Sequence, residues 1–363
     1  MNRHRAKQGR RLLGLTLAVV GVLALPIDWH SLAREAAYLA VGLRQPAAMA
    51  AADNRGGGDV PAVQVLSTPA ALTEGEWPNR ADSTRVEIPQ PLAAPAITMI
   101  DPPGKQGNGG TILTKTISSG NRRVGIATVN RSGKEENIAA ALAAKLPVTF
   151  TDTKEPQVLI LHTHTTEGYL TYDAGYYNAG DRDRTKDHKK NVCAVGEAIK
   201  LTLEAEGIGA IHDTTVHDSP QYTGAYSRSA ATAQEILKKH PTIRVVLDIH
   251  RDAVMEGDTV VKPTATVGGK SAAQMMLITG TVSTDALPHP KWEKNLALST
   301  QLQAALDKVS PDLMRPLNTV ASRYNQHLSP GWMLVEVGAE GNTVEEAVYS
   351  GQILARTLAA LLD

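Results

Sequence analysis

The chain has 363 residues, 42% of them hydrophobic, which is enough for two or three domains or for one domain with appendages. Its 37 basic and 37 acidic residues balance, and no basic stripe interleaved with aromatic residues occurs, which argues against nucleic acid as a partner. The single cysteine, Cys193, excludes an intramolecular disulfide, and its position within a predicted helix indicates a core residue rather than a nucleophile.

A basic segment followed by an apolar one opens the chain. Residues 1–11 contain five basic residues and no acidic one, which leaves 32 basic and 37 acidic residues in the rest. The next sixteen residues, Leu12–Ile27, carry no charge, and Trp29 follows where an interfacial aromatic residue would lie. We predict a cytosolic basic tail (1–11) and a single transmembrane signal anchor (12–27), with residues 28–363 outside the cytosol. A cleaved signal peptide is the alternative.

Most of the segment over residues 28–110 lacks the periodicity of regular secondary structure. Over Pro46–Gly110 the sequence is rich in Ala, Pro, Gly and Thr, and neither a period of 2 nor one of 3.6 persists. We therefore predict a flexible extracytoplasmic tether over 28–110. A transitional segment over 111–152 follows, with a predicted strand at Val124–Asn130 and a short helix at Glu135–Leu146.

Residues 153–363 alternate between short aliphatic runs and longer helical patterns. The predicted strands are Val158–Leu161, Ile208–Ile211, Arg244–Ile249, Met275–Thr279 and Trp332–Val337. The predicted helices are Asn191–Glu206, Ala225–His240, Lys291–Val309 and Thr343–Leu362. This alternation predicts an α/β domain whose mostly parallel sheet is flanked by helices. In such sheets ligands bind beyond the carboxyl ends of the strands, so the residues at those ends are informative.

Imidazole and carboxylate groups gather at these strand ends. They are His162, His164 and Glu167 after the first strand, Asp248, His250 and Asp252 at the third, and Glu336 within the last; His212, Asp213, His217 and Asp218 follow the second. A lone histidine at a strand end is usually a hydrogen-bonded surface or capping group, but three neighbouring strands with such endings favour a metal site. The sequence contains no phosphate-binding loop, no nucleophile elbow and no H-E-x-x-H helix.

The donor types suit zinc, which takes imidazole nitrogen and carboxylate oxygen in a tetrahedral site with one position open for water. We expect Glu336 to act as general base on that water, or to stabilise the transition state in its acid form. Asp248 and Asp252 are expected to orient a ligating imidazole from behind.

Five segments of the chain resemble the stage II sporulation protein P family. They are PQVLILHTHTTEGY (156–169), NVCAVGEAI (191–199), IHDTTVHDSPQYTGAYSRS (211–229), VVLDIHRDA (245–253) and MLVEVGAEGNTVEEA (333–347). They occur in the family's order over about 200 residues, and an N-terminal anchor with a variable tether is similar to the layout of that family.

The resemblance implies that residues 153–363 form a zinc amidase-like catalytic domain. The implied activity is that of a peptidoglycan hydrolase, an N-acetylmuramoyl-L-alanine amidase with possible endopeptidase activity. It implies septal wall remodelling during sporulation and engulfment, with a lytic transglycosylase and a membrane scaffold protein as partners. By similarity to zinc amidases more broadly, His164 and His250 match metal ligands and Glu336 matches the catalytic residue.

The third ligand is open, because the broader amidases carry a glutamate just ahead of the first helix and this chain does not. The candidates are Asp187, His188 and His217. His162 precedes His164 by two residues, on the same strand face, and is expected either to hold a ligating residue in place from behind or to be an alternate ligand. Glu167 is expected to orient one of these imidazoles or to cap the loop.

Tyr222, Tyr226 and Arg228 follow the second predicted strand and are candidates for binding the glycan–peptide strand. A packing role for the three is the alternative. Two other functions compete with the amidase: a zinc carboxypeptidase-like peptidase acting on stem peptides, and a catalytically inactive module that recruits partners to the wall.

Overall fold

The structure is a computed structural model that describes residues 64–65, 94–117, 126–182 and 184–363. The basic tail and anchor predicted over 1–27, and most of the tether predicted over 28–110, lie outside these residues. Within the described part of the chain, no helix is long and apolar enough to cross a membrane. The described residues belong to one folded unit, Ala51–Asp363.

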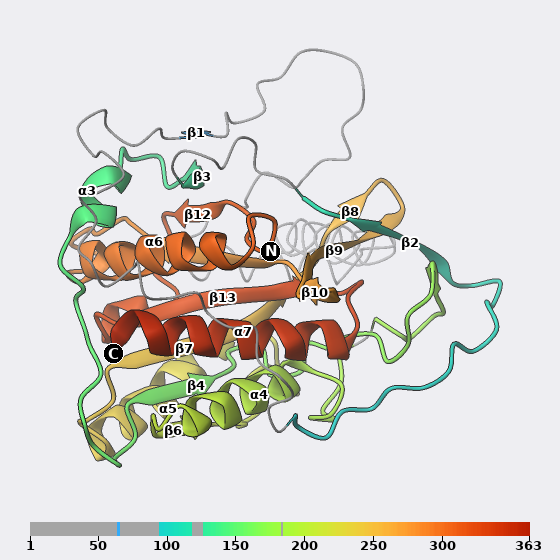
Figure 1. The fold of residues 1–363 in the computed structure, drawn as a ribbon, viewed down its shortest axis with the longest axis horizontal. Helices are drawn as coiled ribbons and strands as arrows, with labels where there is room; N and C mark the ends of the chain where they lie inside the picture. The colour runs from blue at the N-terminus through green and yellow to red at the C-terminus, as the bar shows by residue number, and fades with distance from the viewer. Residues whose placement is uncertain (1–63, 66–93, 118–125, 183) are drawn as a thin grey trace, which may run out of the picture. The chain divides into compact units, whose positions relative to one another are not determined.

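Strands and helices alternate along most of the chain (Figure 1). The strands are β1 (Gln64–Val65), β2 (Gly110–Lys115), β3 (Ala127–Arg131), β4 (Val158–Leu161), β5 (Tyr176–Tyr177), β6 (Ala210–His212), β7 (Val245–Asp252), β8 (Met255–Glu256), β9 (Thr259–Val267), β10 (Lys270–Ala273), β11 (Met275–Gly280), β12 (Leu317–Val320) and β13 (Trp332–Ala339). The helices are α3 (Ile138–Ala143), α4 (Val192–Ala205), α5 (Ala225–Lys239), α6 (Trp292–Val309) and α7 (Val344–Leu362), with a short 3-10 helix, η2, at Gln326–Leu328.

The central sheet has eight strands in the order β1-β3-β12-β11-β13-β7-β4-β6. It is mixed, which corrects the expectation of a mostly parallel sheet: β11 runs antiparallel to β13, and β1 runs antiparallel to β3. The chain between β7 and β11 forms strands β8, β9 and β10 instead of a crossover helix, so β11 enters the sheet in the opposite direction. The neighbouring strands β13, β7, β4 and β6 are parallel, as predicted.

Helices cover both faces of the central sheet. Residues of α4, α6 and α7 form one core with alternate residues of β4 and β7, including Ile160 and Ile249. Residues of α5 form a second core with the intervening residues, including Leu161 and Val246. Successive residues of a strand point to opposite faces, so Asp248 and His250 lie on the α5 face together with Val246. Figure 1 shows α6 and α7 stacked along the sheet.

A second sheet of five strands, β10-β9-β2-β5 with β8 paired to β9, was not predicted from the sequence. In it β2 pairs in parallel with β9, at the boundary where the tether was expected to end. The transitional segment contributes β3 to the central sheet, and the Gln301 side chain of α6 donates hydrogen bonds to the Ala141 and Ala144 carbonyls at the end of α3. Helix α7 begins with a capping box made by Thr343 and Glu346, which confirms the predicted start of this helix.

Candidate active site

The ends of three parallel strands bring the candidate residues together. Glu336 of β13 is in register with His250 of β7, and Leu161 of β4 is in register with Asp248 of β7. Side chains in register on neighbouring strands lie on the same face, so Glu336 and His250 are neighbours on the α5 face. The segment after β4 places His164 beside them, with its ring centroid 5.4 Å from that of His250.

His250 lies between two carboxylates and is 3% exposed. Its Nε2 is 2.9 Å from Asp248 Oδ1, and its Nδ1 is 3.5 Å from Glu167 Oε2. Burial alone would lower the pKa of His250, but Asp248 and Glu167 together raise it well above its usual value.

Glu167 is a buried carboxylate that donors hold in place. Its Oε2 accepts a hydrogen bond from the backbone N–H of Arg251 at 3.1 Å, and its Oε1 lies 3.3 Å from Arg184 Nη2. Burial would raise the pKa of this carboxyl, but the hydrogen bond and charge of His250 outweigh it and lower the pKa to about 2. Glu167 is therefore ionised and oriented against His250.

His164 is buried and neutral. Its ring stacks on Tyr222 with centroids 4.4 Å apart, and Nδ1 has no hydrogen-bond partner among the described residues. Burial lowers the pKa of His164 to about 4. A neutral imidazole with an unused buried nitrogen is a suitable metal ligand.

Glu336 has a carboxyl oxygen, Oε2, that is buried and makes no hydrogen bond within the described part of the chain. Burial, and then the nearby charge of Asp252, raise the pKa of Glu336 to about 8. Asp252 itself pairs with Arg315, whose Nη1 is 2.8 Å from Asp252 Oδ2. The charge of Asp252 thus raises the pKa of Glu336, and Asp252 pairs with Arg315 rather than with an imidazole.

These residues fit a zinc ion. Two imidazoles and one carboxylate, from His164, His250 and Glu167, match the donor set of a catalytic zinc site. Asp248 stands behind His250 as the carboxylate that orients a ligating histidine usually does.

His162 does not share a face with His164, contrary to the sequence expectation. Strand β4 ends at Leu161, and a turn follows, so the alternation that would align the two residues is interrupted. The Nε2 of His162 approaches α4, on the opposite face of the sheet, and its Nδ1 is 2.9 Å from the carbonyl oxygen of Ile249.

The three candidates for the third ligand have other surroundings. Asp187 is exposed and lies 3.5 Å from Lys190 Nζ, and His188 is exposed as well. His217 is buried, but its Nδ1 contacts the carbonyl oxygen of His162 at 2.9 Å and its Nε2 contacts Thr232 Oγ1 at 3.0 Å. Glu167 is the carboxylate that lies against His250.

The three residues suggested for substrate binding divide into two roles. Tyr222 and Tyr226 lie beside His164, with ring centroids 4.4 and 5.5 Å from it, and Tyr222 is 49% exposed. The guanidinium of Arg228 donates to the carbonyls of His217, Thr223 and Gln221, so it closes the loop that carries Tyr222.

Arg184 is a site residue that sequence reasoning missed. Its Nη1 is 2.6 Å from Asp218 Oδ2, its Nη2 contacts Glu167, and its guanidinium carbon lies 4.9 Å from the Tyr222 ring centroid. It stands in the charged run DRDRTKDHKK, which by itself reads as a solvated loop. Nothing in that run distinguishes Arg184 from its basic neighbours until the fold places it over Glu167.

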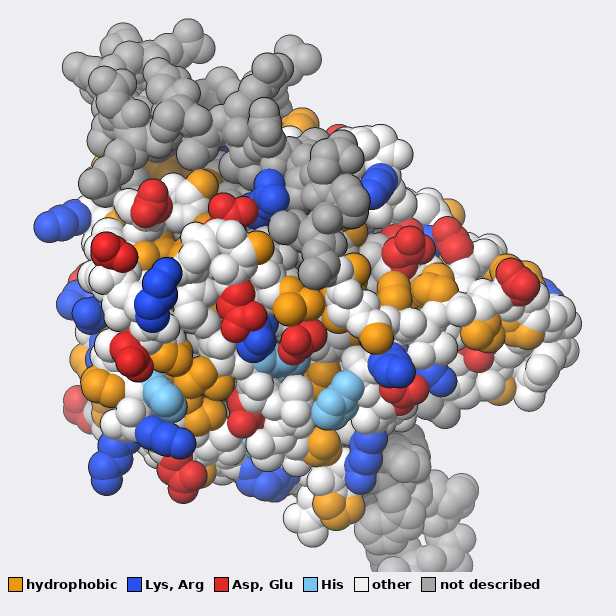
Figure 2. Space-filling view, turned by 60° about the horizontal axis from the view of Figure 1, so that its bottom comes forward, with side chains coloured by type: hydrophobic (Ala, Val, Ile, Leu, Met, Phe, Trp, Pro, Cys, Tyr) orange, Lys and Arg blue, Asp and Glu red, His pale blue; other side chains and the backbone are white. Residues whose placement is uncertain are grey.

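Histidines also reach the surface on one face of the molecule. Figure 2 shows their side chains there among scattered acidic and basic groups. The described charges on this face are mixed rather than gathered into one basic stripe.

Comparisons with known proteins agree with the family suggested by the sequence. A family model for stage II sporulation protein P matches residues 114–359. Stage II sporulation protein P of Bacillus subtilis (strain 168) is 31% identical over 215 residues, which cover 56% of this chain and 50% of the relative. The alignment thus spans about half the length of that relative.

Solved structures that resemble the chain include two amidases. The CwlD amidase from Clostridioides difficile, in complex with the GerS lipoprotein, aligns with a TM-score of 0.36 and 13% identity over 56% of this chain and 95% of that chain. The N-acetylmuramoyl-L-alanine amidase AmiC2 of Nostoc punctiforme aligns with a TM-score of 0.35 and 13% identity over 58% of this chain and 97% of that chain. Since the family match covers well over half of the 363 residues, the chain belongs to the stage II sporulation protein P family.

Proposed function

We propose that the protein is a zinc-dependent peptidoglycan hydrolase that cleaves the amide bond between N-acetylmuramic acid and L-alanine. The observation that carries the proposal is the buried carboxyl oxygen Oε2 of Glu336, which makes no hydrogen bond to any residue that the structure describes. Glu336 is in register with His250, and the His164 ring and the Glu167 carboxylate lie beside His250. Membership in the stage II sporulation protein P family supports a role in sporulation.

The metal would be held by His164, Glu167 and His250. A bound Zn²⁺ supplies a Lewis acid for the amide carbonyl and lowers the pKa of a water molecule toward neutrality. Asp248 keeps the imidazole of His250 in one orientation, and Arg251 and Arg184 keep the carboxylate of Glu167 in place.

Glu336 is the group that moves a proton. Its carboxylate accepts a proton from the attacking water and delivers it to the nitrogen of the leaving amine. Without a cation nearby, burial raises the pKa of Glu336 to about 8. This carboxyl would be held more in its charged form, the form that accepts a proton, with a dication bound nearby.

The substrate would bind over the His164 side of the site. The ring of Tyr222 is stacked on His164 and lies beside the Arg184 guanidinium, and its exposed part offers aromatic surface to a sugar ring or a stem peptide. The ring of Tyr226 packs against the rings of His164, His250 and Tyr324. Tyr226 thus forms the side of the site that is nearest to α5.

We also propose that residues 12–27 anchor the chain in the cell membrane and that the catalytic domain acts outside the cytosol on septal peptidoglycan. A lytic transglycosylase and a membrane scaffold protein are the proposed partners. The charge pattern of the first 27 residues supports this placement. Carbonate washing of membranes tests it: a chain released into the soluble fraction would contradict a retained anchor.

Product analysis on purified sacculi tests the activity. Release of intact stem peptides that begin with L-alanine, leaving unsubstituted muramic acid, is the expected result. Peptide fragments without glycan release would indicate a carboxypeptidase-like enzyme. Absence of any product, with no zinc bound, would indicate an inactive wall-binding module.

A further inference from the structure

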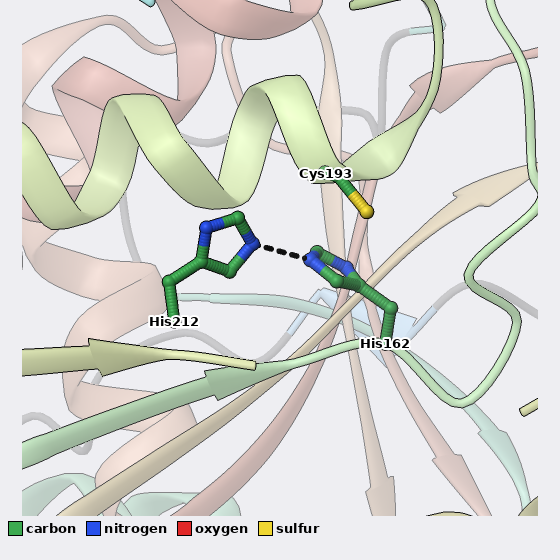
Figure 3. Close-up of side chains that lie close together, drawn as sticks. All are labelled: His162, Cys193 and His212. Atoms are coloured by element: carbon green, nitrogen blue, oxygen red, sulfur yellow. Dashed lines mark hydrogen bonds between the residues drawn. The ribbon is translucent and has the colours of Figure 1, made fainter. Parts of the chain in front are cut away.

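A second cluster of metal-binding side chains lies on the other face of the central sheet. His162 follows β4, Cys193 lies in the first turn of α4, and His212 ends β6. The ligand atoms of the three residues all lie within 4.8 Å of one another. Figure 3 shows the two imidazoles facing each other below α4, with the sulfur of Cys193 beside them.

The outer nitrogens of both histidines fix their tautomers. The Nδ1 of His162 is 2.9 Å from the carbonyl oxygen of Ile249, which only accepts, so this Nδ1 carries the hydrogen. The Nδ1 of His212 is 2.9 Å from Glu197 Oε2. That hydrogen bond lowers the pKa of Glu197, so the carboxylate is ionised and His212 Nδ1 donates to it.

Both Nε2 atoms therefore present lone pairs when the rings are neutral, and they face each other at 2.9 Å. Two acceptors at this distance repel unless a cation lies between or beside them, either a proton on one ring or a metal ion. A shared proton would account for the two imidazoles but not for the buried thiol of Cys193 next to them.

From these contacts we infer that His162, Cys193 and His212 form a second metal site, distinct from the proposed catalytic one, that takes a thiophilic d¹⁰ cation such as Zn²⁺. In tetrahedral zinc sites the metal–nitrogen and metal–sulfur distances are about 2.1 and 2.3 Å, which separates ligand atoms by about 3.4–3.6 Å. Small side-chain rotations bring the three atoms to these separations.

The surroundings of the cluster are those of a metal site. Ligating histidines usually donate their other N–H to a carboxylate or a backbone carbonyl, and here Glu197 and Ile249 accept those bonds. Burial raises the pKa of the Cys193 thiol to about 12, so without a metal the sulfur is protonated and inert. A bound cation would replace that proton.

Gly196 keeps the space over the two nitrogens open. A Cβ at this position would lie 2.4 Å from His212 Nε2 and 2.8 Å from His162 Nε2. Glycine in a helix interior is less stable than alanine by roughly 1 kcal/mol, so its presence inside α4 has a steric reason. The reason here is room for the two imidazoles and what binds them.

The cluster is reached from the surface through a cavity of about 440 Å³. Cys193, Glu197 and His212 line it, together with His188 and Lys189 of the preceding loop. A hydrated cation can enter through this cavity, and a water molecule can complete the coordination. The metal would tie α4 and β6 to the segment that carries His164.

Cobalt titration of the full-length, chelator-stripped protein tests the inference, because a cobalt–thiolate bond gives a charge-transfer absorption that nitrogen and oxygen ligands do not give. We expect two Co²⁺ ions per chain and one thiolate band. Cys193→Ser and His212→Gln should each lose the band and one ion, while His164→Ala should lose the other ion and keep the band. Gly196→Ala should weaken the band without removing a ligand, and His240→Ala, a histidine control, should change neither.

A wild-type protein without the thiolate band, or Cys193→Ser with undiminished cobalt, would overturn the second site and leave a proton shared by the histidines. One ion per chain with a thiolate band, unaffected by His164→Ala, would keep the second site and refute the proposed catalytic one. Thermal unfolding of the same samples reports a fold defect separately, so loss of the band with an unchanged melting temperature in the stripped state counts as support.

Discussion

Glu336→Gln separates the catalytic role of this residue from its effect on stability. Glutamine has nearly the same volume and keeps a polar side chain at this position, but it cannot carry the proton. Turnover on peptidoglycan should therefore fall by a factor of about 10²–10⁴, the contribution typical of general acid–base catalysis. Zinc content should stay at the wild-type level, because Glu336 is not among the proposed ligands.

The same substitution should stabilise the metal-free protein above pH 4.5. The pKa of Glu336 is raised from 4.5 to about 8 in the folded state, so over this range the unfolded chain loses the proton that the folded chain keeps. The contribution of this carboxyl to the free energy of unfolding is therefore fully present below pH 4.5 and is lost as the pH rises from there through 8. At 1.36 kcal/mol per pKa unit, the free energy of unfolding of the wild type at pH 7 is lower than below pH 4.5 by up to about 3 kcal/mol. The glutamine variant has no titrating group at this position and does not lose this free energy.

Thermal unfolding of chelator-treated wild type and Glu336→Gln, measured at several pH values between 4 and 8, checks the magnitude. The difference in melting temperature should be small near pH 4 and should grow steadily toward pH 8. A difference that does not depend on pH would refute the burial argument for Glu336. Near-normal turnover in Glu336→Gln, with the stability change present, would refute its proton-transfer role alone.

Three further predictions concern the groups around the site and one buried histidine. Glu167→Gln should lose zinc on dialysis, because it removes the ionised donor beside His250; metal analysis against wild type checks this, and full retention would exclude Glu167 as a ligand. Asp248→Asn should weaken zinc binding about 10–100-fold in chelator competition, because the carboxylate behind His250 is lost, and unchanged affinity would contradict its orienting role. His289 is buried, its pKa is lowered to about 4 chiefly by burial, and its ring nitrogens have no hydrogen-bond partner among the described residues. Between pH 6.5 and 4 the unfolded chain binds a proton that the folded chain does not, so His289→Gln should be more stable than wild type by up to about 2 kcal/mol near pH 5, and a gap of equal size near pH 7.5 would refute this.

The strands that carry the site were predictable, because each is a short aliphatic run with a polar ending. The observed β4, β7 and β13 lie within a few residues of the predicted strands, and their ends bring His250 and Glu336 into register as neighbours. The strands of the second sheet were not predicted. Lys262 and Pro263 interrupt the apolar run of β9, and only the fold shows that Lys262 is buried there, with Asp173 and Glu346 as ion-pair partners.

The arrangement after β4 was beyond sequence reasoning, since it depends on where the strand stops. A strand continued by three residues would have placed His162 and His164 on one face. The turn after Leu161 sends them to different faces, and it brings Glu167 back against His250. The residue at which β4 ends thus decides which imidazole belongs to which cluster.

Three threonines lie between His162, His164 and Glu167 in the segment after β4. They explain how a segment without regular secondary structure can fix the positions of these side chains. The hydroxyl of Thr163 donates to Asp248 of β7 and contacts Ser229 of α5, so it joins the turn to both layers. The hydroxyl of Thr165 contacts the carbonyl oxygens of His162 and Thr215, and that of Thr166 donates to Asp218. Metal ligands and catalytic groups must be held to within about 0.5 Å, which a loop achieves only when buried contacts fix its own backbone. The repeated threonine in HTHTTE therefore supplies at the end of β4 the rigidity that β7 and β13 obtain from strand pairing.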